Sequence, residues 1–315
     1  MTRQHEYSSA TELPPELISI GSLNAYEIAT DDIRVACRLS DPNYEIGQLV
    51  MLDISMTSFE LRVEHVADQF FMGYHAIPHL REVLVEIGGY VRSRDASGWR
   101  VARIESSFLR DAFVLENGPA FVFGNRGEIF RMDAGGAWSR DATGTDSTIY
   151  AMHGTSAETL HAVGGKGTFL RAQGREWQAV ELGIGDELRC VRQVGDRIFV
   201  GGEGGFAAEL RDSELRLIAT GIESDILSIA CFRDQIYFSD SDFGLHRLAG
   251  DAFVPVAELG YVCRLNATPR WLTLDAGEFV FQFDGTHWRG IEITYRDGYR
   301  AEGYDMSFLG TPPEG

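Results

Sequence analysis

Acidic residues in turns between predicted strands are the side chains whose type and spacing best support chemistry at a surface. The partner-binding candidates are Asp186 and Glu187 in GIGDELR, Glu203 in GGEGG, Glu223 and Asp225 in GIESDIL, and Asp240 and Asp242 in SDSDFG, with Asp111 in FLRDAF as a further acidic residue. Carboxylates gathered on one face attract and steer a basic ligand. If these turns occupy equivalent places in the fold, we expect that face to bind a basic protein. The alternative is a generally acidic, solvated surface.

The sequence contains none of the common catalytic motifs. A G-x-S-x-G nucleophile elbow is absent, and the glycine-rich stretches GGKGT and GGEGG lack the spacing of a phosphate-binding loop. Arginines that could bind a substrate carboxylate are frequent, and they include Arg81, Arg92, Arg110, Arg189 and Arg264. Nothing in their spacing marks three of them as convergent. We therefore expect no catalytic residues and no cofactor.

Metal-ligating residues do not cluster along the chain. Asp240 and Asp242 could offer oxygen ligands to calcium, but the D-x-D-x-D-G pattern and its distal glutamate are missing. His75 and His79 are four residues apart, yet no H-E-x-x-H pattern surrounds them. The four cysteines, Cys37, Cys190, Cys231 and Cys263, form no C-x-x-C pair. We expect free thiols and no metal.

The overall charge argues against two classes of partner. The chain of 315 residues has a formal net charge of −19 and a pI of about 4.8, and such a surface repels nucleic acid and anionic membranes. The first residues show no positive region followed by an apolar run, and no stretch approaches the roughly 18 apolar residues of a membrane-spanning helix. These features predict a protein of a bacterial-type cytoplasm.

Aromatic and apolar anchors recur along the chain at a nearly constant spacing. Trp99, Trp138 and Trp177 are 39 residues apart. The same phase continues at Phe59 before them and at Leu215, Phe253 and Trp288 after them. A glycine-turn strand precedes each anchor from Trp99 to Trp177, as in GGKGTFLRAQGREW, which ends at Trp177, and weaker copies precede the later anchors. These two markers, anchor and glycine-turn strand, stay in phase over six or seven periods, which indicates a repeat protein.

Each period contains short strands separated by turns. Stretches such as TIYAMHG, LHAVGG and TFLRA are short and are bounded by turn residues. Four such strands in about 40 residues are typical of a propeller blade. The sequence therefore predicts an all-β propeller, with seven four-stranded blades as the first choice. Six blades plus a separate N-terminal segment is the alternative.

The repeat divides the chain into a single domain and its ends. Residues 1–22 are expected to be a polar extension, 23–58 an irregular first blade, and 312–315 a tail. The propeller spans 23–311, and the segment 288–308 is expected to return to the first blade and close the ring. The stretches PPELISIGSL and PHLREVLVEI could be short helices, although the second fits a strand equally well.

One turn resembles a known motif. RMDAGGAW, with Asp133, Gly135 and Trp138, resembles the aspartate box of sialidase-like BNR propellers, although Arg131 replaces the usual hydroxyl residue. SRDASGW and DGTHW resemble shortened copies, and the preceding strands are similar to those of photosystem II assembly-factor propellers. The resemblance implies that Asp133 braces a hairpin and that it takes no part in catalysis.

The sequence contains less information about the function of the protein than about its fold. The favoured hypothesis is a non-catalytic propeller that holds a basic protein on an acidic face, as an immunity-like inhibitor or as an assembly or scaffold factor. The alternative is a small-ligand or glycan-binding propeller, including a hydrolase, that uses its central channel. Convergence of Trp, Tyr and Arg in the channel would favour the alternative.

Overall fold

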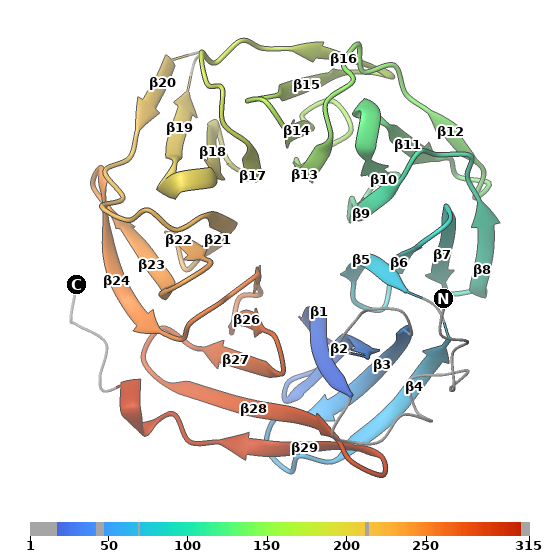
Figure 1. The fold of residues 1–315 in the computed structure, drawn as a ribbon, viewed down its shortest axis with the longest axis vertical. Helices are drawn as coiled ribbons and strands as arrows, with labels where there is room; N and C mark the ends of the chain where they lie inside the picture. Colours follow the sequence, from blue (N-terminus) through green and yellow to red (C-terminus); the bar gives the residue numbers. More distant parts are fainter. Residues whose placement is uncertain (1–17, 42–46, 69, 212–213, 310–315) are drawn as a thin grey trace, which may run out of the picture.

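The chain folds into a seven-bladed β-propeller (Figure 1) in a computed structural model that describes residues 18–41, 47–68, 70–211 and 214–309. Six blades are antiparallel sheets of four strands, and the last blade has five. The blades follow one another around the ring in sequence order. The predicted seven-bladed all-β propeller is confirmed, and the six-bladed alternative is wrong.

The first three blades use the strands nearest the N-terminus. Blade 1 consists of β1 (Ser19–Glu27), β2 (Asp32–Ser40), β3 (Gly47–Ser55) and β4 (Leu61–Ala67). Blade 2 consists of β5 (Phe71–Ile77), β6 (Arg81–Glu86), β7 (Tyr90–Asp95) and β8 (Gly98–Arg103). Blade 3 consists of β9 (Leu109–Val114), β10 (Ala120–Gly124), β11 (Ile129–Met132) and β12 (Trp138–Arg140).

Blades 4 to 6 repeat this order. Blade 4 consists of β13 (Ile149–His153), β14 (His161–Gly164), β15 (Phe169–Gln173) and β16 (Glu176–Ala179). Blade 5 consists of β17 (Leu188–Val194), β18 (Arg197–Gly202), β19 (Ala207–Arg211) and β20 (Glu214–Leu217). Blade 6 consists of β21 (Ile226–Phe232), β22 (Gln235–Asp240), β23 (Gly244–Ala249) and β24 (Ala252–Glu258).

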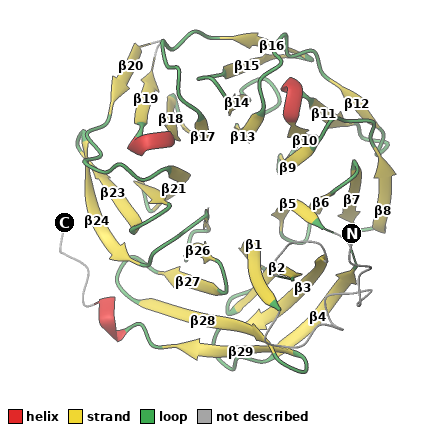
Figure 2. Ribbon diagram, viewed as in Figure 1, coloured by secondary structure: helices red, strands yellow, loops and turns green. Residues whose placement is uncertain are grey.

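Blade 7 is enlarged by one strand. It consists of β25 (Arg264–Ala267), β26 (Leu272–Ala276), β27 (Phe279–Phe283), β28 (Trp288–Tyr295) and β29 (Tyr299–Tyr304). Three single-turn 3₁₀ helices complete the described structure: η3 (Asn125–Gly127), η4 (Glu203–Gly205) and η5 (Ser307–Leu309). Figure 2 shows η3 and η4 beside the strands of blades 3 and 5.

The hydrophobic core lies between blades. The second strand of blade 3, β10, is buried at all five residues, because sheets cover both of its faces. The outermost strand of blade 5, β20, is mostly exposed. One buried cluster joins Phe121 of blade 3 to Leu170 of blade 4, and similar clusters occur at other blade boundaries. Each blade therefore needs its neighbours to bury its apolar surface.

The repeat anchors mark the outermost strand of each blade. Trp99, Trp138, Trp177, Leu215, Phe253 and Trp288 lie at or near the start of the fourth strands, and Phe59 lies in the turn before β4. Trp177 is buried in the cluster between blades 3 and 4. Phe59 is exposed, but its ring packs on Gly303 of blade 7, where a Cβ atom would come within 2.5 Å of the ring.

Backbone hydrogen bonds also join neighbouring blades at two anchors. The N–H of Trp177 donates to the carbonyl oxygen of Ala142 at 2.9 Å, and Ala142 lies in the connection that leaves blade 3. The N–H of Phe253 donates in the same way to Ala219, at 3.2 Å, in the connection that leaves blade 5. The anchors that define the repeat therefore take part in contacts between blades, and each of them also marks a strand within its own blade.

The C-terminal segment does not close the ring as expected. β28 pairs with β27 as the fourth strand of blade 7, and β29 pairs with β28. Blade 1 already takes all four of its strands from residues 19–67, so it has no place for a returning strand. The segment reaches blade 1 through side chains instead, since the Tyr299 hydroxyl donates to Gln48 Oε1 at 2.9 Å.

Three further expectations about the N-terminal part need correction. Residues 19–22 belong to β1 and not to an extension, and the first blade is a regular four-stranded sheet that extends to residue 67. The PPELISIGSL stretch is extended from Ser19 onward, and PHLREVLVEI contains β6. β6 is buried at five consecutive residues, as expected of a short strand covered on both faces by neighbouring sheets. Residues 1–17 and the predicted tail 312–315 lie outside the described residues.

Candidate functional site

The topology brings the predicted acidic turns to one face. We call the face on which the innermost strands begin the upper face, and the opposite one the lower face. Leu188 at the start of β17 pairs with Gly202 at the end of β18, so the turns before β17 and after β18 lie together. Ile226 and Asp240 pair in the same way in blade 6. Asp186, Glu187, Glu203, Glu223, Asp225 and Asp242 therefore all belong to the upper face.

These carboxylates differ in exposure. Asp186, Glu223 and Asp242 are exposed. Glu187, Glu203 and Asp225 are half-buried. Asp225 Oδ1 accepts a hydrogen bond from the backbone N–H of Gly204 at 3.1 Å, which joins blade 6 to the η4 turn of blade 5. Exposed carboxylates are available to a partner, whereas Asp225 already contributes to the contact between blades.

Asp240 does not belong to the acidic surface. It is fully buried at the end of β22, where Oδ2 contacts His246 Nε2 at 2.5 Å. Oδ1 accepts hydrogen bonds from the backbone N–H groups of Asp242 and Phe243 at 2.8 and 2.6 Å. Burial alone would raise the pKa of Asp240, but the bond to His246 and the backbone donors lower it to about 2. Asp240 therefore holds the turn between β22 and β23.

An arginine–tyrosine cluster on the upper face escaped the sequence analysis. Arg189 Nη2 lies 2.8 Å from Glu187 Oε2 and 2.9 Å from Glu203 Oε1. The Tyr150 hydroxyl donates to Glu187 Oε1 at 3.0 Å. Arg110 and Arg189 both lie over the Tyr150 ring, at 5.4 and 4.8 Å from its centroid. Glu187 and Glu203 are therefore already paired within the protein.

The sequence did contain a signal for this cluster. Arg110, Tyr150 and Arg189 are each the second residue of the first strand in three consecutive blades. A β-bulge at that position interrupts the pairing with the second strand in all three blades. An alignment of inner strands would have superimposed the three residues, whereas the alignment on outer-strand anchors did not.

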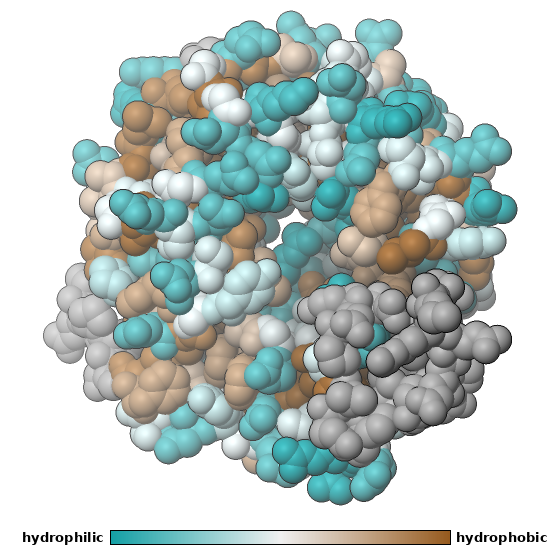
Figure 3. Space-filling model, in the orientation of Figure 1, coloured by the Kyte–Doolittle hydropathy of each residue, from teal (hydrophilic) through white to brown (hydrophobic). Residues whose placement is uncertain are grey.

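The channel is crossed by an ion pair between blades that are not neighbours. Arg264 of β25 in blade 7 binds Asp111 of β9 in blade 3. Asp111 was expected in an exposed turn, but it is buried, and burial raises its pKa although Arg264 opposes the shift. Gly73 makes room for it, since a Cβ atom there would lie 2.3 Å from Asp111 Oδ1. Figure 3 shows an opening at the centre of the molecule with hydrophilic residues around it.

A second buried carboxyl group lies where blade 7 meets blade 1. Asp275 of β26 is fully buried, and its Oδ1 accepts a hydrogen bond from the Ser22 hydroxyl of blade 1. Its Oδ2 atom has no hydrogen-bond partner among the described residues. Burial raises the pKa of Asp275 to about 7, against the effects of Arg264 and Cys263. This carboxyl group titrates near neutrality at the closing contact of the ring.

The aspartate-box residues make local turn contacts. Asp133 Oδ1 accepts hydrogen bonds from the N–H groups of Gly135 and Ala137 at 2.8 and 2.9 Å. Asp95 and Asp284 do the same in the corresponding turns of blades 2 and 7. These turns join third to fourth strands on the lower face. The geometry fits the bracing role that the resemblance implies.

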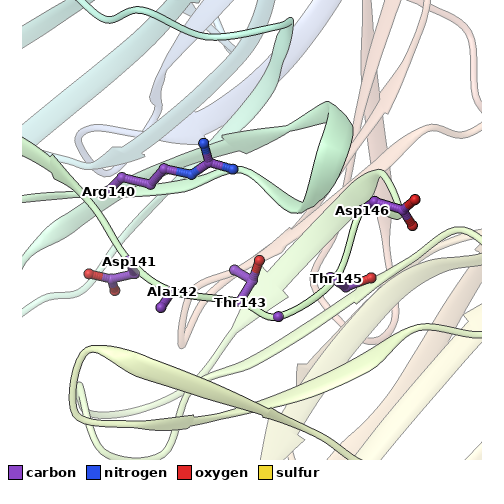
Figure 4. Close-up of a pocket in the computed structure, with 7 residues that line it drawn as sticks. Arg140, Asp141, Ala142, Thr143, Thr145 and Asp146 are labelled. Atoms are coloured by element: carbon purple, nitrogen blue, oxygen red, sulfur yellow. The ribbon is translucent and has the colours of Figure 1, made fainter.

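A surface pocket beside blade 3 does not gather functional groups. It has a volume of about 770 Å³ and is lined by one continuous segment, residues 140–146 (Figure 4). Asp141 in this segment is buried and binds Arg131 Nη2 at 2.8 Å. Figure 4 shows the labelled side chains spread along the segment, and they do not point to one spot. This pocket is a groove at the boundary between blades 3 and 4.

Neither a metal site nor a membrane-spanning helix occurs in the described part of the chain. Across residues 18–309, apart from the undescribed gaps, no three His, Cys, Asp or Glu side chains lie close enough to share a metal ion. Within the same ranges, no helix has the length and apolar character needed to cross a bilayer. The four cysteines are free thiols, and Cys37 and Cys190 are buried.

Comparison with solved structures shows the fold. YCF48 bound to D1 peptide matches with a TM-score of 0.58 and 14% identity over 82% of this chain and 89% of that one. The WD40 propeller domain of Doa1 matches with a TM-score of 0.64 and 8% identity over 91% and 94%. The Pan2 WD40 domain of Neurospora crassa matches with a TM-score of 0.57 and 10% identity over 81% and 86%.

Sequence comparison identifies no family. No family profile matches the chain, and no curated protein matches it either. The likeness to YCF48 supports the resemblance to photosystem II assembly factors at the level of the propeller fold. Membership of the BNR family has no support beyond the aspartate-box pattern itself.

Proposed function

We propose that this protein is a non-catalytic, protein-binding propeller that holds a basic partner on its upper face. This proposal rests on the observation that the upper-face turns of blades 5 and 6 carry the exposed carboxylates Asp186, Glu223 and Asp242. Rigid strands fix the turns that carry them, so the charges are held in place before a partner arrives. Such a field raises the association rate with a basic protein.

The neighbouring groups shape this acidic surface. The single positive charge of Arg189 offsets part of the charge of Glu187 and Glu203, so these two carboxylates contribute less to binding than their positions in the sequence indicate. Lys166 lies in the turn of blade 4, beside the connection that carries Asp186. The binding surface therefore centres on the connection between blades 5 and 6.

The fold supports a protein partner in a general way. YCF48 has been solved with a bound D1 peptide, so a propeller of this architecture can hold a polypeptide. The partner proposed for the present chain is identified by charge alone. It is either a basic protein whose activity the propeller blocks, as an immunity-like inhibitor would, or a basic subunit that it holds during assembly.

The test combines capture with kinetics. Tagged protein is used to recover partners from the source cell in parallel with the triple variant Asp186→Asn, Glu223→Gln, Asp242→Asn. A basic partner recovered by the unaltered chain is then measured for association rate between 0.05 and 0.5 M salt, a range over which the Debye length falls from about 14 to about 4 Å. We expect a rate that falls with salt and is at least tenfold slower with the triple variant.

A matched control separates the site from the total charge. Glu60→Gln, Glu158→Gln, Glu302→Gln removes as many exposed charges from outside the upper face. Its association rate should stay within twofold of that of the unaltered chain. An acidic or uncharged partner, or equal slowing by both triple variants, would reject the proposal. Loss or retention of the partner's own activity in the complex distinguishes the inhibitor from the assembly factor.

A further inference from the structure

Aromatic rings from four consecutive blades form an arc around the lower end of the channel. Tyr26, His75, Phe113 and His153 come from β1, β5, β9 and β13. Successive ring centroids are 5.8, 5.1 and 5.6 Å apart. Arg192 of β17 continues the series in blade 5. These five side chains line a cavity of about 600 Å³ that opens on the lower face, within the range of volumes that hold small organic ligands.

Both histidines in the arc are fixed in the same tautomer. His75 Nδ1 accepts the backbone N–H of Val114 at 3.3 Å, and His153 Nδ1 accepts that of Gln193 at 3.1 Å. Because Nδ1 accepts, the proton of each neutral ring is on Nε2. Neither Nε2 atom has a hydrogen-bond partner among the residues that the structure describes. Two N–H donors are therefore free to bind a ligand.

The two rings stay neutral under ordinary conditions. Burial lowers the pKa of His75 to about 3, and the charges of Arg264 and Arg192 add to the effect. Burial also lowers the pKa of His153 well below its usual value, again with help from Arg192. Arg192 lines the same cavity as both rings. The histidines supply hydrogen-bond donors, and Arg192 supplies the only positive charge of this group.

Arg192 itself lacks a counter-ion. Within the described ranges, no carboxylate forms an ion pair with its guanidinium group, and its buried Nε atom has no hydrogen-bond partner. Glu27 and Glu116 also line the cavity. Glu27 accepts a hydrogen bond from Thr268, and Glu116 is exposed at the rim. A sequestered charge without a partner is costly, so a cation kept in this position favours an anionic ligand.

We propose that the lower mouth of the channel binds an organic monocarboxylate, whose carboxylate group pairs with Arg192 and accepts hydrogen bonds from Nε2 of His75 and His153. A guanidinium group matches a carboxylate in geometry and in charge. The single positive charge of Arg192 fits a monoanion better than a phosphate dianion in a protein of net charge −19. The apolar remainder of the lining receives a carbon skeleton and includes Ala76, Ile77, Pro78, Phe113 and Leu115.

The carboxylate can come from a free acid or from the C-terminus of a peptide. This site lies on the face opposite to the acidic surface, so it does not depend on the proposed protein partner. Calorimetry with phenylacetate and with its neutral analogue phenylacetamide tests the charge requirement. A second pair of probes, a short peptide ending in phenylalanine with a free or an amidated C-terminus, tests the other source.

We expect at least one acid to bind at least tenfold more tightly than its amide. Arg192→Met removes the charge and keeps an apolar chain of similar length, and it should weaken binding at least tenfold. The control Arg300→Met changes an exposed arginine of β29 and should bind as the unaltered protein does. Thermal unfolding checks that both variants are folded.

Three results would overturn the proposal. They are equal binding of acids and amides, undiminished binding by a folded Arg192→Met variant, and no binding of either acid. If Arg192→Met fails to fold, Arg192→Lys keeps the charge but loses the forked geometry, and it should weaken binding while preserving the preference for the acid. The comparison of acid with amide on the unaltered chain decides the charge requirement in either case.

Discussion

Asp111 and Arg264 bind each other across the central channel, although 153 residues separate them in the sequence. Their blades, the third and the seventh, are not neighbours in the ring. The pair therefore connects two parts of the propeller that share no sheet. Asp111 is buried, whereas the Arg264 side chain keeps about a third of its surface exposed. Solvent screening at Arg264 limits what the pair contributes to stability.

Asp111→Asn should lower the free energy of unfolding by about 1–3 kcal/mol, because a charged hydrogen bond is lost and Arg264 is left unpaired. Chemical denaturation of Asp111→Asn, Arg264→Met and the double variant measures the coupling between the two residues. The double variant should be more stable than the sum of the single effects predicts. Strict additivity would show that the pair contributes no coupling energy.

Stability should depend on pH through Asp275. Its pKa is about 7 in the folded protein and near 4 when unfolded. A raised pKa in the folded state means that the stabilising contribution is complete below pH 4 and is lost as pH rises to 7. The loss amounts to about 4 kcal/mol at most, at 1.36 kcal/mol per pKa unit. Asp275→Asn should flatten the curve of unfolding free energy between pH 4.5 and 7.5, and an unchanged slope would contradict the assignment.

Substitution of a buried repeat anchor should destabilise the protein more than substitution of an aspartate-box residue. Trp177→Ala should lower the free energy of unfolding by about 3–5 kcal/mol, because it empties a buried space between two blades. Asp133→Ala should cost about 1 kcal/mol, because it removes turn hydrogen bonds at an exposed site. Urea denaturation of both variants provides the measurement. A larger effect for Asp133→Ala would reverse the assigned roles.

Removal of residues 288–315 should cause unfolding or aggregation. The truncation deletes the fourth and fifth strands of blade 7, exposes the edge of β27, and removes the contact between Tyr299 and Gln48. Size-exclusion chromatography and circular dichroism of the truncated chain are the measurements. A monomeric truncated protein with an unchanged unfolding temperature would show that six blades and a reduced seventh are sufficient.

The fold could be predicted from the sequence because large side chains recur at a regular spacing along the chain. Trp138 and Trp177 recur once per blade, and their spacing counts the blades correctly. The closure was predicted wrongly, because a segment that follows the last anchor can pair within its own blade or with the first one. Only the positions of β28 and β4 in space distinguish these arrangements, and local patterns carry no such information.

The candidate sites were harder to predict for a related reason. Turn carboxylates such as Asp186 and Asp242 could be assigned to one face from strand order alone. The burial of Asp240 depends on His246, which lies in the next strand. The group around Arg192 depends on rings from four other blades, and its successive members are 38 to 49 residues apart. The closed ring of blades brings these residues together around the channel. The pattern of residues along the sequence did not indicate these contacts.

Blade 1 takes its four strands from one continuous stretch, and so does every other blade. Among the residues that the structure describes, no sheet combines strands from the N-terminal and C-terminal parts of the chain. The seven boundaries between blades are therefore topologically equivalent, apart from the one at which the chain begins and ends. A circular permutant that joins the present ends and opens the chain between blades 3 and 4 would keep all seven sheets intact. The same modularity allows a propeller of this kind to gain or lose a blade by duplication or deletion of one segment of about 40 residues.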